Sequence, residues 1–174
     1  LRQDGRAERS MREHIAITSR LSGEAHPHVV ETKRALADVL GCMERVDEAR
    51  RLRDEAIPVE VEQLSRALAH DPADYSTLRR RGADLAELGR VNEALEDFDR
   101  AIALQPQRPS LRAARADALA RNGRFAEALA DLSAALDMDG DEHFRWYLSA
   151  CLSAYLARAE DHANRSRDML RRFG

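Results

Sequence analysis

Histidines are the first side chains in this sequence that suggest a chemical role. His26 and His28 flank Pro27, and two imidazoles at this spacing are able to bind a metal ion. No cysteine or carboxylate cluster stands at ligand spacing around them, so we interpret the segment as a connecting turn. The sequence accordingly predicts no metal and no other cofactor.

The remaining candidates for catalysis do not form a recognisable arrangement. Four more histidines are scattered over separate segments, without a serine or cysteine nucleophile pattern beside them: His14, His70, His143 and His162. The glycines occur singly at positions that suit turns, so the sequence offers no glycine-rich loop for binding phosphate. We therefore expect a protein that is not an enzyme.

Two cysteines, Cys42 and Cys151, lie on separate predicted helices. We interpret them as reduced core thiols of an intracellular, cytoplasmic protein, with a disulfide between them as the alternative. No signal peptide is visible in the sequence, which agrees with the cytoplasmic interpretation.

The composition limits the classes of partner. Of the 174 residues, 34% are charged and 5% are aromatic, a balance that suits exposed amphipathic helices better than a thick, closed core. The formal net charge of −3 gives no case for a nucleic-acid partner. The longest apolar runs are far shorter than a membrane span. We therefore expect neither nucleic acid nor membrane among the partners.

The elements that position these side chains repeat along the chain. Residues 75–108 and 109–142 share a pattern at an offset of 34 residues. Seven positions of the first segment recur with the same residue type in the second: Gly89, Arg90, Glu93, Ala94, Leu95, Asp97 and Ala101. A fixed period of this length predicts a solenoid built from stacked helix pairs.

The spacing inside one repeat predicts two helices. Leu78, Gly82 and Leu85 share one face of a first helix, and Gly82 is small enough to let a neighbouring helix approach. Gly89 suits the left-handed residue that ends this helix. One face of the second helix carries an aromatic residue between two small ones: Ala94, Phe98 and Ala101. Pro106 then closes the repeat, because proline cannot continue a helix.

These repeats resemble the tetratricopeptide repeat (TPR). Counted from Tyr75, the small and turn positions of that family fall on glycine or alanine, its large positions on Leu78, Leu85 and Phe98, and its terminal proline on Pro106. The resemblance is strongest over residues 75–142. It implies an all-α fold, an α-α superhelix in the form of a right-handed TPR solenoid of helix-turn-helix repeats, that binds other proteins.

The first part of the chain resembles the longer repeats of kinesin light chains, which carry a similar Gly-x-x-His-Pro connector. Residues 1–27 are predicted to hold the second helix of an incomplete repeat and its connector, and residues 28–74 an irregular longer repeat. Glu44 stands where the turn glycine is expected. Because proline breaks helices, we expect the helix to end near Ile57–Pro58 and a new one to run from about 58 to 70.

The last part, residues 143–174, is predicted to be an atypical terminal TPR-like helix pair. Trp146 takes a large first-helix position, Ala157 takes the place of the turn glycine, and the second helix covers about 159–172. Residues 1–174 would then form a single TPR solenoid domain. Because the sequence begins within a repeat, we expect it to be part of a longer protein, and its unpaired terminal helices would permit self-association.

The resemblance also implies where a partner would bind, because first helices of TPRs line a concave groove. The groove positions with side chains suited to binding are Arg79, Arg80, Asp117, Arg121, Phe144, Tyr147, Cys151 and Tyr155. The last first helix has a second apolar stripe that also includes Leu148. This stripe would be covered by a peptide, by a following repeat or by a second copy of the chain. Ala83 stands where family members that clamp a C-terminal carboxylate have asparagine.

These observations predict a non-catalytic protein–protein interaction scaffold. Its partner would be a peptide or protein with acidic and apolar residues, held in the concave TPR groove. The alternative is a regulatory or oligomerising TPR segment of a larger multidomain bacterial enzyme, such as a Ser/Thr kinase or a caspase-like protease. Such enzymes often carry repeats of this type, and the residues that would separate the two functions lie outside the sequence.

Overall fold

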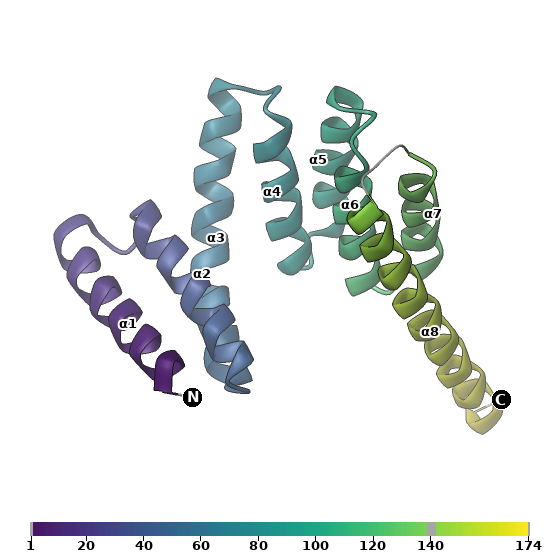
Figure 1. Ribbon diagram of the computed structural model, residues 1–174, viewed down its shortest axis with the longest axis horizontal. Helices are drawn as coiled ribbons and strands as arrows, with labels where there is room; N and C mark the ends of the chain where they lie inside the picture. Colours follow the sequence, from purple (N-terminus) through teal and green to yellow (C-terminus); the bar gives the residue numbers. More distant parts are fainter. Residues whose placement is uncertain (1, 139–141, 174) are drawn as a thin grey trace. The chain divides into compact units, whose positions relative to one another are not determined.

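The computed structural model describes the backbone of residues 2–138 and 142–173 and the side chains of residues 5–138 and 147–164. Within this part of the chain all regular structure is helical, and no strand is present. The helices are α1 (Arg2–Ser22), α2 (Pro27–Cys42), α3 (Val46–His70), α4 (Tyr75–Glu87), α5 (Val91–Leu104), α6 (Pro109–Arg121), α7 (Phe125–Leu136) and α8 (Glu142–Phe173) (Figure 1).

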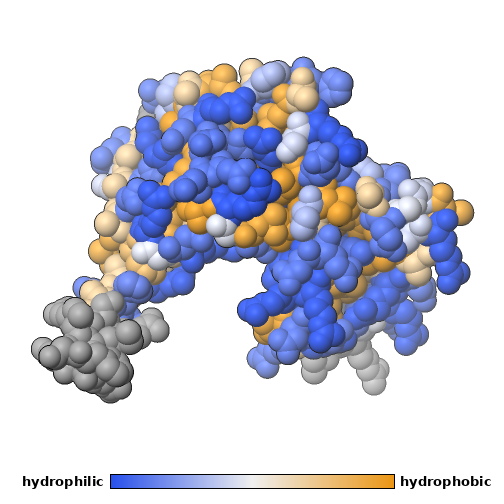
Figure 2. All heavy atoms as spheres, turned by 180° about the vertical axis from the view of Figure 1, so that it is seen from behind, coloured by the Kyte–Doolittle hydropathy of each residue, from blue (hydrophilic) through white to orange (hydrophobic). Residues whose placement is uncertain are grey.

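The chain divides into two compact units. Unit 1 is Leu1–His70 and contains α1 to α3; unit 2 is Asp71–Gly174 and contains α4 to α8. On the face seen in Figure 2, hydrophilic residues predominate, and hydrophobic residues are visible in strips between them. The description of residues 1–174 as one solenoid domain remains a prediction.

In unit 1, α2 packs between α1 and α3. The core contains Leu36, Ala37, Leu40 and Ala49, and α1 contributes Met11 and Ile15 at its edge. On α1 the apolar contacts come from Met11 and Ile15, whereas Ile17 is 59% exposed.

The predicted break at Ile57–Pro58 is wrong, because α3 continues from Val46 to His70 with Pro58 inside it. Pro58 and Asp54 are both exposed, so the carbonyl group that loses its helical hydrogen bond lies on the side of the helix that faces water. The other side of α3 is held against α2 both before and after Pro58. Ion pairs join α2 to α3 on both sides of Pro58: Arg53–Asp38 at 2.7 Å and Arg34–Glu60 at 2.7 Å.

Unit 2 begins with two antiparallel helix pairs, α4–α5 and α6–α7 (Figure 1). The first-helix residues Leu78 and Leu85 are buried, and so are Ala94, Phe98 and Ala101 on the second helix, as predicted. A Cβ atom on Gly82 would lie 3.1 Å from the carbonyl oxygen of Ala94 and 3.2 Å from the Phe98 ring. Gly82 therefore permits the close approach of α5 that the sequence suggested.

The predicted terminal helix pair is wrong, because α8 runs without interruption from Glu142 to Phe173. The segment contains no glycine or proline, and alanine at position 157 favours helix where the repeat pattern expects a turn. The role expected for Trp146 falls outside the described side chains. The early part of α8 packs against α7, and Leu148 is fully buried in the cluster with Leu119, Leu132 and Ala135.

Three turns between paired helices share one geometry. Each contains a left-handed residue, Glu44 at φ 61°, Gly89 at φ 76° and Gly123 at φ 77°. The following arginine donates its backbone N–H to a leucine carbonyl five residues earlier, at 2.9 Å from Arg45, 2.8 Å from Arg90 and 2.9 Å from Arg124. Glycine adopts this conformation without strain, so Glu44 is the costly member of the set.

Candidate functional site

The first helices of unit 2 carry the predicted groove residues. Arg79 and Arg80 are exposed on α4, and Asp117 and Arg121 lie on α6, which packs directly against α4. The pattern that places them here is the repeat itself, since positions 34 residues apart occupy equivalent sites on successive first helices. Arg79, Arg80 and Arg121 are therefore exposed on two first helices that pack against each other, and their role in binding remains a prediction.

The carboxylate of Asp117 connects α6 to α8. One oxygen accepts a hydrogen bond from the hydroxyl of Tyr155 at 2.9 Å, and the other accepts one from Arg121 Nε at 2.7 Å. Burial of the phenol, together with its hydrogen bond to Asp117, raises the pKa of Tyr155 well above its ordinary value. Tyr155 is consequently a neutral hydrogen-bond donor at physiological pH.

Two more predicted residues join this cluster from the preceding turns of α8. A hydrogen bond between the Tyr147 hydroxyl and the Cys151 thiol raises the pKa of Tyr147, and the negative charge of Asp117 raises it further. The Tyr147 side chain is 54% exposed, whereas Cys151 and Tyr155 are half-buried against the core. Asp117, Arg121, Tyr147, Cys151 and Tyr155 therefore form one cluster, which we call the α6–α8 cluster.

Other predictions about this surface fare differently. Leu148, which was expected in the second apolar stripe, is fully buried and belongs to the core. The side chain of Phe144 lies outside the described residues. Both cysteines are free; Cys42 is exposed, so its interpretation as a core thiol is wrong. His26 caps α2, because its Nδ1 accepts the backbone N–H of His28 at 3.4 Å, as a connecting turn requires.

The α6–α8 cluster offers recognition chemistry. Its accessible groups are a guanidinium and a phenol ring, which suit carboxylates and apolar side chains respectively. In the described part of the chain, no group of three or more His, Cys, Asp or Glu side chains is placed to hold a metal ion. Likewise, none of the described helices is both long and apolar enough to span a bilayer.

Sequence reasoning missed a second set of polar contacts, between first and second helices of the same repeat. Arg81 donates two hydrogen bonds of 2.7 Å to the buried carboxylate of Asp97. Arg115 likewise donates hydrogen bonds of 2.7 and 2.6 Å to the carboxylate of Asp131. The sequence did indicate these pairs, because the arginine and the aspartate both recur after 34 residues. Because Asp97 and Asp131 are buried, each needs its arginine to offset the cost of desolvation.

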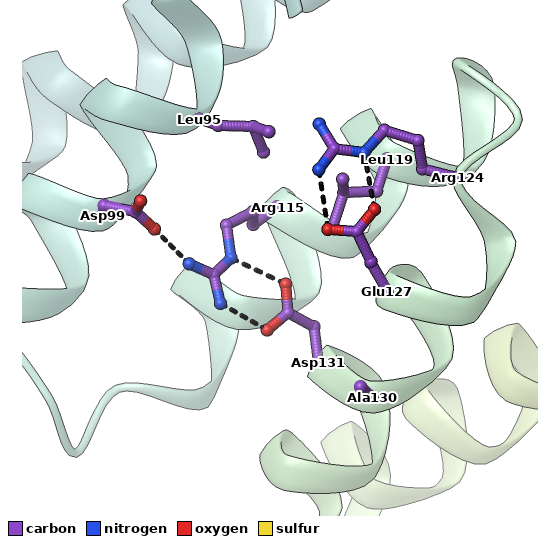
Figure 3. A pocket seen from close by; sticks show the side chains of 8 residues that line it. All are labelled: Leu95, Asp99, Arg115, Leu119, Arg124, Glu127, Ala130 and Asp131. Carbon is purple, nitrogen blue, oxygen red and sulfur yellow. Dashed lines mark hydrogen bonds and ion pairs between the residues drawn. The ribbon is translucent and has the colours of Figure 1, made fainter. Parts of the chain in front are cut away.

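A pocket lies between α5, α6 and α7, on the side of unit 2 formed by second helices (Figure 3). Its volume is about 350 Å³, and its apolar lining is Leu95, Leu119 and Ala130. Figure 3 shows Arg115 between Asp99 and Asp131, and Arg124 facing Glu127. Arg124 donates to both oxygens of Glu127, at 2.7 and 2.6 Å.

Comparisons with known proteins agree with this geometry. Residues 61–109 and residues 79–143 each match the family model of the tetratricopeptide repeat. No curated protein matches the chain significantly in sequence. The two matches to the family model cover the end of α3 and the helix pairs α4–α5 and α6–α7.

Two solved structures show a similar fold. One is described as a Podosopora anserina putative kinesin light chain with nearly identical TPR-like repeats. It is 19% identical, with a TM-score of 0.56, over 97% of this chain and 84% of that one. A point variant of that protein is 18% identical, with a TM-score of 0.57, over 98% of this chain and 84% of the variant. The repeated helix pairs and the family match show tetratricopeptide repeats over residues 61–143, and the likeness to these structures shows a fold that is all-α and of the α-α superhelix class.

Proposed function

We propose that the chain is a non-catalytic interaction scaffold that binds a partner protein through the first-helix face of unit 2. This face comprises α4, α6 and the described part of α8 up to Tyr155. TPR repeats generally bind protein partners, which supports the class of function. The observation that carries the proposal is the α6–α8 cluster. In it the exposed side chains of Arg121 and Tyr147 lie beside Asp117, whose carboxylate already accepts hydrogen bonds from Tyr155 and Arg121.

The chemistry of this face favours an extended or helical peptide with both acidic and apolar residues. Arg79, Arg80 and Arg121 provide guanidinium groups, which bind carboxylates through charge-assisted hydrogen bonds. Tyr147 provides a large and rigid contact area at low entropic cost, as tyrosine does in many interfaces. Asp117 is held by Tyr155 and Arg121 and would repel acidic groups placed directly over it.

Selection from a random peptide library, displayed on phage and panned on the purified chain, tests this proposal. We expect selected peptides to be enriched in Asp or Glu together with apolar residues. Their binding should be lost in the double variant Arg79→Glu/Arg121→Glu. The matched control is Arg66→Glu/Arg90→Glu, which changes the net charge equally at exposed sites outside α4, α6 and α8. Enrichment of basic peptides, or equal loss in both double variants, would refute the proposal.

The aromatic part of the face needs a different variant design. Tyr155 packs against the core, so replacing it with alanine would also disturb stability. Tyr147→Ala removes an exposed ring and leaves the core intact, and Tyr155→Phe removes only the hydroxyl. We expect Tyr147→Ala to weaken peptide binding and to leave the circular dichroism spectrum unchanged.

A further inference from the structure

The turn between α6 and α7 contains an Asn–Gly pair that the two equivalent turns lack. Asn122 is the C-cap residue of α6, and Gly123 follows it with a φ of 77°. At the position of Asn122, the turn after α4 has a leucine and the turn after α2 has a methionine. Of the three asparagines in the sequence, Asn122 is the one that precedes a glycine.

This pair of residues is able to react with itself, because asparagine is a chemically labile residue and glycine has no side chain to hinder an approach to its nitrogen. The backbone nitrogen of Gly123 loses its proton to base and forms a bond to Cγ of Asn122. The Cγ–Nδ2 bond breaks, and Nδ2 leaves as ammonia after taking up a proton from water. A water molecule then opens the five-membered imide at either carbonyl group, which leaves aspartate or isoaspartate at this position.

Burial does not prevent this reaction in the folded chain. Asn122 and Gly123 are both exposed, and a Cβ atom placed on Gly123 would have no heavy atom within 4 Å. Water and base therefore have access to the pair. Protection can come only from the geometry of the turn itself.

The turn holds both reacting groups in hydrogen bonds. Nδ2 of Asn122, which would be the leaving group, donates to the carbonyl oxygen of Ala118 at 2.8 Å. The backbone N–H of Gly123, which would become the nucleophile, donates to the carbonyl oxygen of Ala120 at 3.1 Å. Both bonds must be given up before the imide is able to form.

Ring closure also requires a different backbone conformation. The ψ angle of Asn122 is 15° in the folded turn. The imide brings Cβ of Asn122 and the nitrogen of Gly123 into one ring, and with tetrahedral geometry at Cα this requires a rotation of ψ by roughly 100° or more. Such a rotation breaks the 2.9 Å hydrogen bond from the backbone N–H of Arg124 to the carbonyl oxygen of Leu119. The folded turn and the reaction therefore exclude each other.

We propose that Asn122 is a site of spontaneous deamidation that reacts only while the end of α6 is open, so that the modification marks chains in which this part of unit 2 has opened. The rate in the folded chain is then the rate in the unfolded chain multiplied by the fraction of time for which the turn is open. This inference is independent of the binding function proposed for the first-helix face.

Peptide mapping by mass spectrometry tests the proposal on the full chain, kept in mildly alkaline buffer either folded or unfolded in guanidinium chloride. In the unfolded chain we expect deamidation at Asn122 and little at Asn92 and Asn164, which glutamate and arginine follow. In the folded chain the reaction at Asn122 should be at least about tenfold slower. Equal rates in the two states, or a stable Asn122 in the unfolded chain, would overturn the proposal.

Two variants decide whether the Asn–Gly pair and the turn are responsible. Asn122→Gln keeps an amide but needs a larger ring, so deamidation at this position should stop in both states. Leu88→Asn places the same pair in the turn after α4, where ψ of residue 88 is −1° and Gly89 has a φ of 76°. Position 88 should then react in the unfolded chain and be protected in the folded one. Rapid reaction at position 88 in a folded chain, or continued deamidation in Asn122→Gln, contradicts the assignment.

Hydrogen exchange shows whether opening of the turn controls the reaction. Guanidinium chloride added below the unfolding transition should accelerate deamidation of Asn122 and exchange of the Arg124 amide by the same factor, because both require the hydrogen bond to Leu119 to open. The proposal is wrong if exchange at Arg124 accelerates and deamidation in the same samples does not.

Discussion

Tyr155 donates its hydroxyl hydrogen bond to Asp117 across 2.9 Å and so joins α8 to α6. The second oxygen of the same carboxylate accepts from Arg121 Nε at 2.7 Å. One aspartate therefore sets the position of a tyrosine from the following first helix and of an arginine one turn away on its own helix. This arrangement links the packing of α8 to the geometry of the proposed binding face.

The first prediction concerns this hydrogen bond. Tyr155→Phe keeps the ring in the core and leaves Asp117 with Arg121 alone, so the free energy of unfolding should fall by about 1 kcal/mol. Tyr75→Phe is a suitable control, because the Tyr75 ring lies under the Arg108 guanidinium at 4.8 Å and that contact does not use the hydroxyl. Urea denaturation measures both. Equal effects of the two substitutions would show that the Tyr155–Asp117 bond adds nothing specific.

The second prediction tests the continuity of α3. Pro58→Ala restores a backbone N–H donor for the carbonyl group of Asp54, which should raise the free energy of unfolding by roughly 1–3 kcal/mol. Part of this gain is offset, because proline restricts the unfolded chain and alanine does not. Pro109→Ala should bring no such gain, because Pro109 is in the first turn of α6, where no intrahelical acceptor awaits its amide. A loss of stability in Pro58→Ala would support the helix break instead.

The third prediction uses the three equivalent turns. Glu44 holds a left-handed conformation that glycine adopts in the other two, so Glu44→Gly should stabilise unit 1 by about 0.5–1 kcal/mol. The reverse experiment, Gly123→Ala, should destabilise unit 2 by about 1 kcal/mol, although open space surrounds the position. In denaturant titrations we therefore expect the free energy of unfolding to rise in Glu44→Gly and to fall in Gly123→Ala. Destabilisation by Glu44→Gly would mean that the side chain of Glu44 makes a stabilising contact.

The fourth prediction concerns acid. Hydrogen bonds from the hydroxyls of Ser76 and Thr77, with the backbone N–H of Ser76, lower the pKa of Asp74 from 3.8 to about 2 in the folded chain. A carboxylate with a depressed folded pKa stabilises the fold above its unfolded pKa, and this contribution is lost as pH falls from about 4 to about 2.

Asp74→Asn removes this titration. The variant should be less stable than the parent chain at neutral pH, and the difference should shrink at about pH 2. Asp71→Asn is the control, because Asp71 accepts a single backbone N–H, from Ala73. Denaturation at the two pH values provides the measurement. A difference for Asp74→Asn that is independent of pH would contradict the assigned pKa.

The fold was predictable wherever repeat spacing carried the information. Gly89 recurs after 34 residues, Gly82 and Phe98 follow local helix rules, and all three have the expected burial or backbone conformation. The helix around Pro58 was not predictable from local rules, because packing and ion pairs on both sides of the proline outweigh one lost hydrogen bond. The turn expected near Ala157 failed for the opposite reason, since a repeat pattern was extended over a segment without a helix breaker.

The candidate site was predictable in its positions and not in its contacts. The repeat register placed Asp117, Tyr147 and Tyr155 on first-helix faces, but the hydrogen bond between α6 and α8 depends on how the helices pack. Leu148 shows the limit of the register, because it stands at a groove position and is buried in the core. The ion pair between Arg115 and Asp131 was visible as two recurring charges, and only their separation in space identifies them as partners.

The most direct test of the central claim is the footprint of a bound peptide. A peptide selected on the chain is added to ¹⁵N-labelled protein, and shifts of backbone amides are mapped on the helices. The proposed function predicts that the largest shifts lie on α4, α6 and α8, around Arg79, Arg121 and Tyr147, and that Tyr147→Ala weakens binding. Largest shifts confined to α5 and α7, with unchanged affinity in Tyr147→Ala, would contradict it.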